Sequence, residues 1–444
     1  MKMPVSPPRV DDILDRLGEE QLKAVVGGRP LVEGKYLHWD NIRHREPPNE
    51  LTPEEWWVKI KLARDSASEA MPLLDKSDRP FGLAYVAPLR QGLHRIDQSF
   101  GMTGSSSDVQ EMVSAHGRSY LLTNSLMEEA IRSSQLEGAS TTRVRAKEMI
   151  RERRRPGDKS ERMILNNFRA MERIEELARE ELTSGLVFEL HRILVDGTLD
   201  DAEKAGVFRT AEDRVVVELL HTVETAHVPP AAADLPDRME RLLDFANQET
   251  PDEWLHPVLR AVILHFMIGY DHPFVDGNGR VARALFYWAM LRYGYPLTKY
   301  LSISRVLREA PVQYARAYLH TETDGSDLTY FVDHQIQVIL QSIESLARYV
   351  DRKASETRVL EADIRDSSGL NPRQLRLLGH ALRNPGFEYT VRSHQSSHRV
   401  VNNTARADLV DLVDRGLLIR SMRGRRHTFI APRDLRTRLR ALES

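Results

Sequence analysis

Cysteine is absent from all 444 residues of the chain. Its absence excludes disulfides, thiolate zinc sites and cysteine nucleophiles, and it is compatible with a reducing compartment. The chain also lacks an apolar run approaching ~18 residues, the length that a membrane span needs. Its N-terminus, MKMPVSPPRVDDILDRL, places prolines and acids where a signal peptide needs an unbroken apolar core. We therefore expect a cytoplasmic protein.

Neither sign of charge dominates the sequence, because the formal net charge is only −2. This balance gives no global reason to expect nucleic acid or a membrane as a partner. Hydrophobic residues make up 41% and charged residues 29%, which is ordinary for a folded soluble protein. The length exceeds what one hydrophobic core usually serves, so about two or three domains are expected.

Helical periodicity prevails along the chain and predicts a mainly α protein with a short β-hairpin among its helices. A helical accessory region is expected over residues 1–105. The Gly/Ser-rich stretch Gly101 to Ser107 predicts the first boundary, followed by linking helices over 106–185. The segment GVFRTAEDRVVVELLHTVETAHVPPA clusters β-branched residues that stop at Pro229 and Pro230, so we place the hairpin there.

The composition changes from Asn371 to the end of the chain. This segment holds 15 arginines, no lysine and 6 acidic residues, so it carries +9 while the rest carries −11. Two predicted helices and two short strands around Gly424 follow in the order of a winged helix-turn-helix, which predicts a separate domain over 371–444. Two interpretations stay open. The domain binds DNA phosphates, or it is a protein-recognition or packing module with a solvated basic face. The arginines that would meet phosphates are Arg399, Arg406, Arg420, Arg423, Arg425 and Arg426.

The segment HPFVDGNGRVAR, from His272 to Arg283, is predicted to lie between two apolar helices. Gly277, Asn278 and Gly279 let successive backbone N–H groups point into one concavity at the start of a helix, where anions bind. Arg280 and Arg283 are three residues apart, so they share a helix face and can reach neighbouring phosphates.

Two further side chains of this loop suit phosphate chemistry. A carboxylate beside phosphates, such as Asp276, is the usual protein ligand of Mg²⁺. His272 can accept the proton of an attacking hydroxyl, because the unperturbed pKa of histidine lies near working pH. The alternative is that DGNGR is only a tight turn that opens a helix, with solvated arginines. The complete pattern in its helix–loop–helix context favours phosphoryl or nucleotidyl transfer.

The segment matches the signature HxFx[DE]GNGRxxR at every defined position, and the chain thus resembles the Fic (Fido) family. The resemblance implies a helical Fic core over 186–338, which leaves a connecting helix over 339–370. It also implies transfer of AMP from ATP to a Ser, Thr or Tyr hydroxyl of a protein, with Mg²⁺ as cofactor. The implied roles are base for His272, Mg²⁺ ligand for Asp276, α- and β-phosphate binding for Gly277, Asn278, Gly279 and Arg280, γ-phosphate binding for Arg283, and anchoring of the loop for Phe274.

Alternatives to AMP transfer remain within the resemblance. Relatives with lysine in place of the second glycine resemble kinases, so Gly279 favours nucleotidyl transfer, although other phosphate-containing groups are also transferred in the family. A DNA-binding regulator with a secondary Fic core is the other alternative. The implied partners are ATP and an unidentified target protein, which could be the chain itself, and a homodimer is compatible with this interpretation.

An upstream segment, Ser133 to Gly138, matches the family's inhibitory pattern [ST]xxxE[GN]. Glu137 can form an ion pair with Arg283 and occupy the guanidinium group that should bind the γ-phosphate. We therefore predict an autoinhibited enzyme. The alternative is that Glu137 only ends a solvated helix before Gly138.

Two further segments resemble parts of the family's active site. The stretch TVETAHVPP resembles the flap that aligns a target segment, and we assign to it Glu224, Thr225, Ala226 and His227. We expect His227 to be structural rather than catalytic. Tyr314 is assigned to the adenine side, although the family often has two adjacent tyrosines there and this chain has Gln313 before Tyr314.

Overall fold

The computed structural model describes residues 1–101, 118–219, 224–247, 254–365, 369–383, 386–398, 400–423, 426–432 and 434–441. Most of the predicted Gly101 to Ser107 boundary therefore lies outside the described residues. The chain forms two compact units, Met1–Leu346 and Ala347–Ser444. The five-part division proposed from the sequence stays a prediction.

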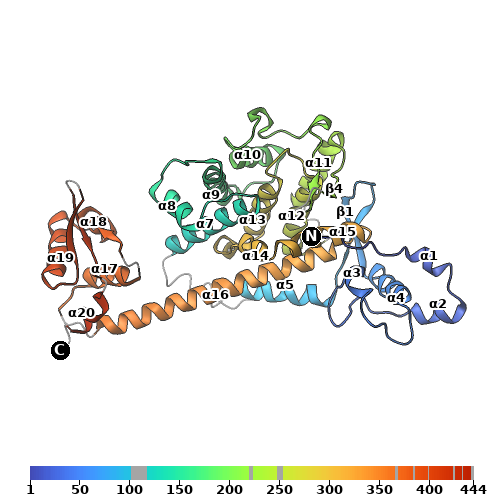
Figure 1. Cartoon of the computed structure of the whole chain (residues 1–444), viewed down its shortest axis with the longest axis horizontal. Coiled ribbons are helices and arrows are strands. Elements are labelled where there is room, and N and C mark those ends of the chain that lie inside the picture. The colour runs from blue at the N-terminus through green and yellow to red at the C-terminus, as the bar shows by residue number, and fades with distance from the viewer. Residues whose placement is uncertain are drawn as a thin grey trace. The chain divides into compact units, whose positions relative to one another are not determined.

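The N-terminal unit is mainly helical, as predicted (Figure 1). Its α-helices are α1 (Val10–Leu14), α2 (Glu19–Val25), α3 (Trp39–Ile42), α4 (Pro53–Asp65), α5 (Ala87–Phe100), α7 (Arg118–Leu136), α8 (Arg143–Glu152), α9 (Lys159–Leu177), α10 (Ser184–Val195), α11 (Leu235–Asn247), α12 (Pro257–Asp271), α13 (Asn278–Arg292), α14 (Ile303–Glu309), α15 (Pro311–Thr323) and the first part of α16 (Thr329–Arg365). Short 3-10 helices are η1 (Ala202–Lys204), η2 (Ala211–Asp213), η3 (Ala232–Asp234) and η4 (Pro296–Tyr300). Its strands are β1 (Ser68–Leu74), β2 (Pro80–Ala84), β3 (Val217–Glu218) and β4 (Thr225–His227).

The first hundred residues contain a two-stranded antiparallel sheet that the sequence did not lead us to expect. β1 pairs with β2 in a register that places Ser68 opposite Ala84. The sheet is joined to the rest of the unit, since Gly82 N–H donates to the Ser326 carbonyl at 3.1 Å. Arg64 of α4 likewise donates to the Tyr330 hydroxyl at 2.7 Å. The N-terminal region therefore packs as part of the larger unit.

Helices α12 and α13 form the centre of this unit. Both sequences carry apolar residues on every side of the helix, and a helix of that kind is buried on all faces. All residues from Val258 to Ile268 in α12, and from Arg280 to Met290 in α13, are buried. α13 contacts α7, α9, α10 and α12. The loop between the two helices, from His272 to Gly277, is thus held by a rigid core.

Helix α7 is fixed to its surroundings by a buried carboxylate, Glu129. It accepts hydrogen bonds from the Ser302 hydroxyl at 3.0 Å and from Ser304 N–H at 3.1 Å. Burial raises the pKa of Glu129 above its ordinary value. These contacts fasten α7 beside the start of α14 and set where its C-terminal end lies.

The C-terminal unit begins within α16 and has its own core, which includes Leu378, Leu409, Leu412 and Phe429. Its further elements are α17 (Pro372–Arg383), β5 (Glu388–Tyr389), α18 (Val391–His398), α19 (Asn402–Asp414), β6 (Ile419–Arg423), β7 (Arg426–Ile430) and α20 (Leu435–Ala441). The three strands are ordered β5-β7-β6. α18, β5 and α20 are additional to the elements expected from the sequence. None of the described helices of the chain combines the length and apolar character that crossing a bilayer requires.

Candidate active site

The loop between α12 and α13 depends on two left-handed backbone positions. His272 caps the end of α12 with a φ of 46°, and Gly277 precedes α13 with a φ of 86°. A Cβ at position 277 would stand 2.9 Å from Val195 Cγ1. Only glycine suits both this backbone angle and this space. The chain therefore turns sharply at both ends of this loop, between α12 and α13.

Asn278 locks the loop from within. Its Oδ1 accepts from Phe274 N–H at 2.9 Å, and its Nδ2 donates to the Phe274 carbonyl at 2.8 Å. Phe274 is fully buried and stacks on the His191 ring with centroids 3.8 Å apart. Both polar atoms of the Asn278 side chain are thus used in hydrogen bonds within the loop. Only the backbone of Asn278 is available to a ligand.

His272 is arranged to be a neutral base. Its Nδ1 lies 3.0 Å from the Gly269 carbonyl. A carbonyl oxygen only accepts, so Nδ1 carries the proton and Nε2 keeps a lone pair. Burial lowers the pKa of His272 below its ordinary value, which also favours the neutral ring. Arg209 fixes the backbone here by donating to the His272 carbonyl at 2.7 Å.

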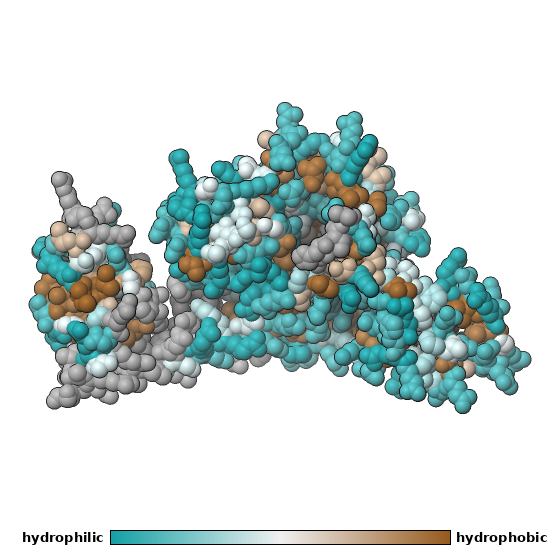
Figure 2. Space-filling model, viewed as in Figure 1, coloured by the Kyte–Doolittle hydropathy of each residue, from teal (hydrophilic) through white to brown (hydrophobic). Residues whose placement is uncertain are grey.

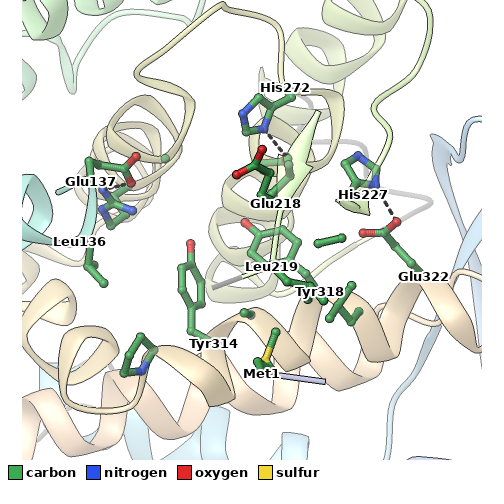
Figure 3. A pocket seen from close by; sticks show the side chains of 18 residues that line it. Met1, Leu136, Glu137, Glu218, Leu219, His227, His272, Tyr314, Tyr318 and Glu322 are labelled. Atoms are coloured by element: carbon green, nitrogen blue, oxygen red, sulfur yellow. Dashed lines mark hydrogen bonds and ion pairs between the residues drawn. The ribbon is translucent and has the colours of Figure 1, made fainter. Parts of the chain in front are cut away.

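A cavity of about 280 Å³ opens beside this loop (Figure 3). Of the residues assigned to the site, the structure brings the following to its lining: Glu137, Ala226, His227, His272, Gly279, Arg283 and Tyr314. The others do not line it: Ser133, Gly138, Glu224, Thr225, Asp276, Gly277, Asn278 and Arg280. Figure 3 shows Glu137 and His272 on opposite sides of the space, with Tyr314 below.

Arg283 is bound by two residues of the upstream segment. Its Nη2 lies 2.9 Å from Oε1 of Glu137, and its Nε donates to the Ser133 hydroxyl at 2.8 Å. Burial would lower the pKa of Arg283, but the Glu137 carboxylate raises it above its ordinary value. The same Glu137 oxygen lies 2.3 Å from where a Cβ on Gly279 would stand. The Glu137 carboxylate therefore lies on the glycine-rich turn as well as on Arg283. Gly138 follows with a φ of 90°.

Arg280 and Asp276 lie on a different side of the loop. Arg280 is 1% exposed and donates to the Leu194 carbonyl at 2.9 Å. Its Nη2 is 3.3 Å from Oδ1 of Asp276, and its buried Nε has no hydrogen-bond partner among the described residues. The Asp276 side chain is 47% exposed. The structure thus separates Arg280, which braces the loop from beneath, from Arg283, which faces the cavity.

Tyr314 and the hairpin residues Ala226 and His227 line a further part of the cavity. Tyr314 holds its hydroxyl 2.8 Å from Nε2 of His265. The hairpin is present, with Val217 of β3 opposite His227 of β4; positions 220–223 between them lie outside the described residues. His227 has both ring nitrogens engaged, Nδ1 at 2.6 Å from Glu322 and Nε2 at 2.7 Å from the Tyr270 carbonyl. These contacts give His227 a structural part in holding the hairpin on α12.

The geometry can be set beside known proteins. Residues 181–290 match the model of the Fic/DOC family. Over 116 residues the chain is 39% identical to "Protein adenylyltransferase Fic" of Drosophila willistoni, covering 26% of this chain and 21% of that protein. It is 36% identical over 117 residues to the protein of the same name from Nematostella vectensis, covering 26% and 25%. The chain thus spans about a fifth to a quarter of the length of these relatives.

The fold also resembles a solved structure. A Fic family protein from Desulfovibrio desulfuricans G20 superposes with a TM-score of 0.51 at 20% sequence identity. The match covers 78% of this chain and 97% of that chain. It supports the helical architecture around the Fic/DOC segment, including regions before and after the segment itself.

Several residues that shape the Fic/DOC segment were not singled out from the sequence. Arg209 also donates to the Pro230 carbonyl at 2.6 Å, so it ties the end of the hairpin to the His272 loop. His191 lies 2.9 Å from the Asp276 carbonyl and supports the loop from α10. Asp271 pairs with Arg238 at 2.7 Å, and burial raises its pKa to about 6. No local pattern marks these residues, because the partners named here lie at least 21 positions away.

Proposed function

We propose that the chain is a protein adenylyltransferase that moves AMP from ATP to a hydroxyl group of a protein. One observation carries this proposal: a neutral histidine base and a glycine turn next to a buried arginine line the same cavity. His272 supplies the base, and Gly279 with Arg283 supplies the turn. The relatives matched over this segment carry the same name, protein adenylyltransferase.

The proposed reaction begins at the target hydroxyl. Nε2 of His272 accepts the hydroxyl proton, and the oxygen attacks the α-phosphate of ATP. A new P–O bond forms as the bond to the β-phosphate oxygen breaks, and pyrophosphate leaves. The Gly269 carbonyl holds Nδ1–H of His272 throughout, which orients the ring and stabilises its protonated form.

The phosphates would lie on the turn that begins α13. Backbone N–H groups at Gly279 and the positive end of α13 attract anions, and Arg283 supplies a guanidinium fork. Asp276 fits Mg²⁺ as a single carboxylate ligand, because its side chain is 47% exposed at the edge of this turn. Magnesium bound there would neutralise phosphate charge. Arg280, buried beneath the loop, positions Asp276.

The adenine of ATP and the target protein would bind to the parts of the cavity that do not hold the phosphates. Tyr314, Leu136, Pro311 and Leu319 give one end of the cavity an apolar lining that suits a nucleobase. Thr225 to His227 form the strand that we propose aligns the target chain through its backbone.

We propose further that the enzyme is autoinhibited. Glu137 at the end of α7 occupies the Arg283 guanidinium that the γ-phosphate needs, and its carboxylate repels phosphates from Gly279. ATP would then bind in a non-productive pose. Release requires Glu137 to leave Arg283.

Intact-mass spectrometry of the Glu137→Gly protein after incubation with ATP and Mg²⁺ tests the reaction type. A gain of one AMP per modified chain is expected. Adding His272→Ala to the same protein should remove the gain, because no base remains. A gain of one phosphoryl group, or a gain of AMP that survives His272→Ala, would refute the proposal.

A second proposal concerns the C-terminal unit, which we infer is a DNA-binding winged helix. α18 and α19 follow each other closely enough for a helix-turn-helix, and the exposed side chains at the start of α19 include Asn402, Asn403 and Arg406. Asparagine and arginine are the residues that most often read adenine and guanine edges. Arg420 on β6 is also exposed, whereas Arg399 and Arg425, and the side chains of Arg423 and Arg426, lie outside the described residues.

Salt dependence of duplex binding tests this second proposal. Affinity of the full chain for duplex DNA should fall steeply with salt, and Arg406→Ala should weaken it. Against DNA binding, Val401, Ile419 and Met422 are exposed apolar side chains on this unit. Figure 2 shows hydrophobic surface, coloured brown, on the same unit. Absence of salt-sensitive DNA binding would therefore favour a protein-recognition module instead.

A further inference from the structure

A second cavity lies between α7, α8 and α9. Its volume is about 720 Å³, within the ~300–1,000 Å³ typical of ligand sites. None of the residues that line it also lines the cavity beside His272. The mechanism proposed for His272 makes no use of it.

The floor of this cavity is apolar. Met127 of α7 and Ile150 of α8 are buried, and Leu165 and Phe168 of α9 are half-buried. An aromatic face and flexible methionine next to open space suit the ring system of a ligand. The floor alone would accept many apolar groups.

The rim is strongly basic. Five arginines line it, Arg151, Arg153, Arg154, Arg155 and Arg169, against the single acid Glu172. Arg151 and Arg154 already donate to Asn124 and Glu161 at 3.0 Å and 2.7 Å. Among the described residues, no hydrogen bond or ion pair engages the guanidinium group of Arg153 or of Arg169. Glu172 lies near enough for the charges of Arg153 and Arg169 to lower its pKa against the effect of burial. The N–H groups of these two guanidinium groups thus remain to bind an anion.

The backbone that carries the rim is fixed rather than loose. Arg153 ends α8 in a left-handed conformation with a φ of 52°, which is unfavourable for a non-glycine residue unless its surroundings hold it. Arg154 N–H donates to the Met149 carbonyl at 3.0 Å. Fully buried Glu161 accepts from Gly157 N–H at 2.7 Å as well as from Arg154. The arginines are therefore presented by a braced turn.

We propose that this cavity binds an organic anion in which a phosphate group is joined to an apolar ring. Arg153 and Arg169 would hold the phosphate through paired N–H donors, a geometry that guanidinium groups match. Phe168 and Met127 would contact the ring. A phosphate alone would leave the floor uncovered, and an uncharged ring would leave the rim unpaired.

Isothermal titration of the full chain with 1-naphthyl phosphate tests the site. Naphthol and inorganic phosphate are the matched probes. The affinity of each should be lower than that of 1-naphthyl phosphate by a factor of about 10 or more. Arg153→Ala with Arg169→Ala should weaken binding of 1-naphthyl phosphate about 10-fold or more. Arg241→Ala, which changes an exposed arginine on α11 outside the cavity, should leave it unchanged.

The apolar floor is tested separately by Phe168→Leu. This change should weaken the binding of 1-naphthyl phosphate but not the binding of inorganic phosphate. Unchanged thermal unfolding of the arginine variant is expected, because both side chains are exposed. No binding of 1-naphthyl phosphate at millimolar concentration, or equal affinity in the arginine variant and the native chain, overturns the proposal. Neither outcome depends on transfer activity.

Discussion

Oε1 of Glu137 lies 2.9 Å from Nη2 of Arg283, and the two residues are 146 positions apart in the chain. The contact joins the end of α7 to the helix that begins the candidate phosphate site. Arg283 is 2% exposed, so its buried positive charge needs a negatively charged partner, and Glu137 provides one when no ligand is bound. This pair is therefore the point at which nucleotide binding and restraint compete.

Replacing Glu137 by glycine should raise transfer of AMP about 10-fold or more, because Arg283 becomes available to the γ-phosphate. Initial rates with ATP and Mg²⁺ measure the effect. The control is Glu148→Gln, which changes an exposed acid on α8. Equal rates in the native chain and the Glu137 variant would remove the basis for autoinhibition.

Ser133→Ala should weaken the restraint in part. The change removes the hydroxyl that accepts from Nε of Arg283 at 2.8 Å and leaves a buried donor unpaired, which costs about 1–3 kcal/mol. Lower thermal stability together with higher transfer activity is expected. Ser133→Thr keeps a hydroxyl at this position and should return both stability and activity to the values of the native chain. Loss of stability without any rise in activity would show that Ser133 supports the fold but not the restraint.

Gly279→Ala should reduce transfer about 10-fold or more even when Glu137 is already glycine. The new Cβ would stand 3.1 Å from Nη1 of Arg283, within the space proposed for phosphate oxygens. Gly185→Ala in α10 is a matched control, because its Cβ would have only an ordinary contact, 3.6 Å from the Thr183 hydroxyl. Normal activity of the Gly279 variant would place the phosphates elsewhere.

The pH profile of transfer should report on His272. Its neutral form is the base, so activity is lost as pH falls through its pKa. Burial lowers that pKa from 6.5, and the acid limb of kcat/KM should therefore lie below pH 6.5. Asp271, whose pKa burial raises to about 6, is the neighbouring group that could produce a similar limb. The limb should persist in Asp271→Asn, and an acid limb above pH 6.5 would argue against a buried neutral base.

The sequence predicted the local parts of the site better than its supports. HPFVDGNGR encodes its turn within a few residues, because Gly277 and Asn278 act on the loop they belong to. Arg209 and His191 act on the same loop from 63 and 85 positions away, and no short pattern reveals such partners. Arg280 shows the limit of helix spacing. It is three residues from Arg283, yet burial against the Leu194 carbonyl turns it away from the cavity.

The fold shows the same contrast between features that local sequence patterns reveal and features that depend on distant partners. Long apolar helices such as α12 and α13 were predicted from their pattern, since burial on all sides leaves a clear signal. The β1–β2 sheet was not predicted. Its strand SEAMPLL contains Pro72 and alternates weakly, and pairing with PFGLA is what stabilises it. α18 and β5 are too short for periodicity to show.

Transfer of radiolabel from ATP tests the central claim most directly. The Glu137→Gly protein is incubated with Mg²⁺ and a heat-inactivated cell lysate, which supplies targets without active kinases, once with ATP labelled at the α-phosphate and once with ATP labelled at the γ-phosphate. The account predicts protein labelling from the α-label only, and none when His272→Ala is added. Protein labelling from the γ-label, or α-labelling that does not require His272, would contradict it.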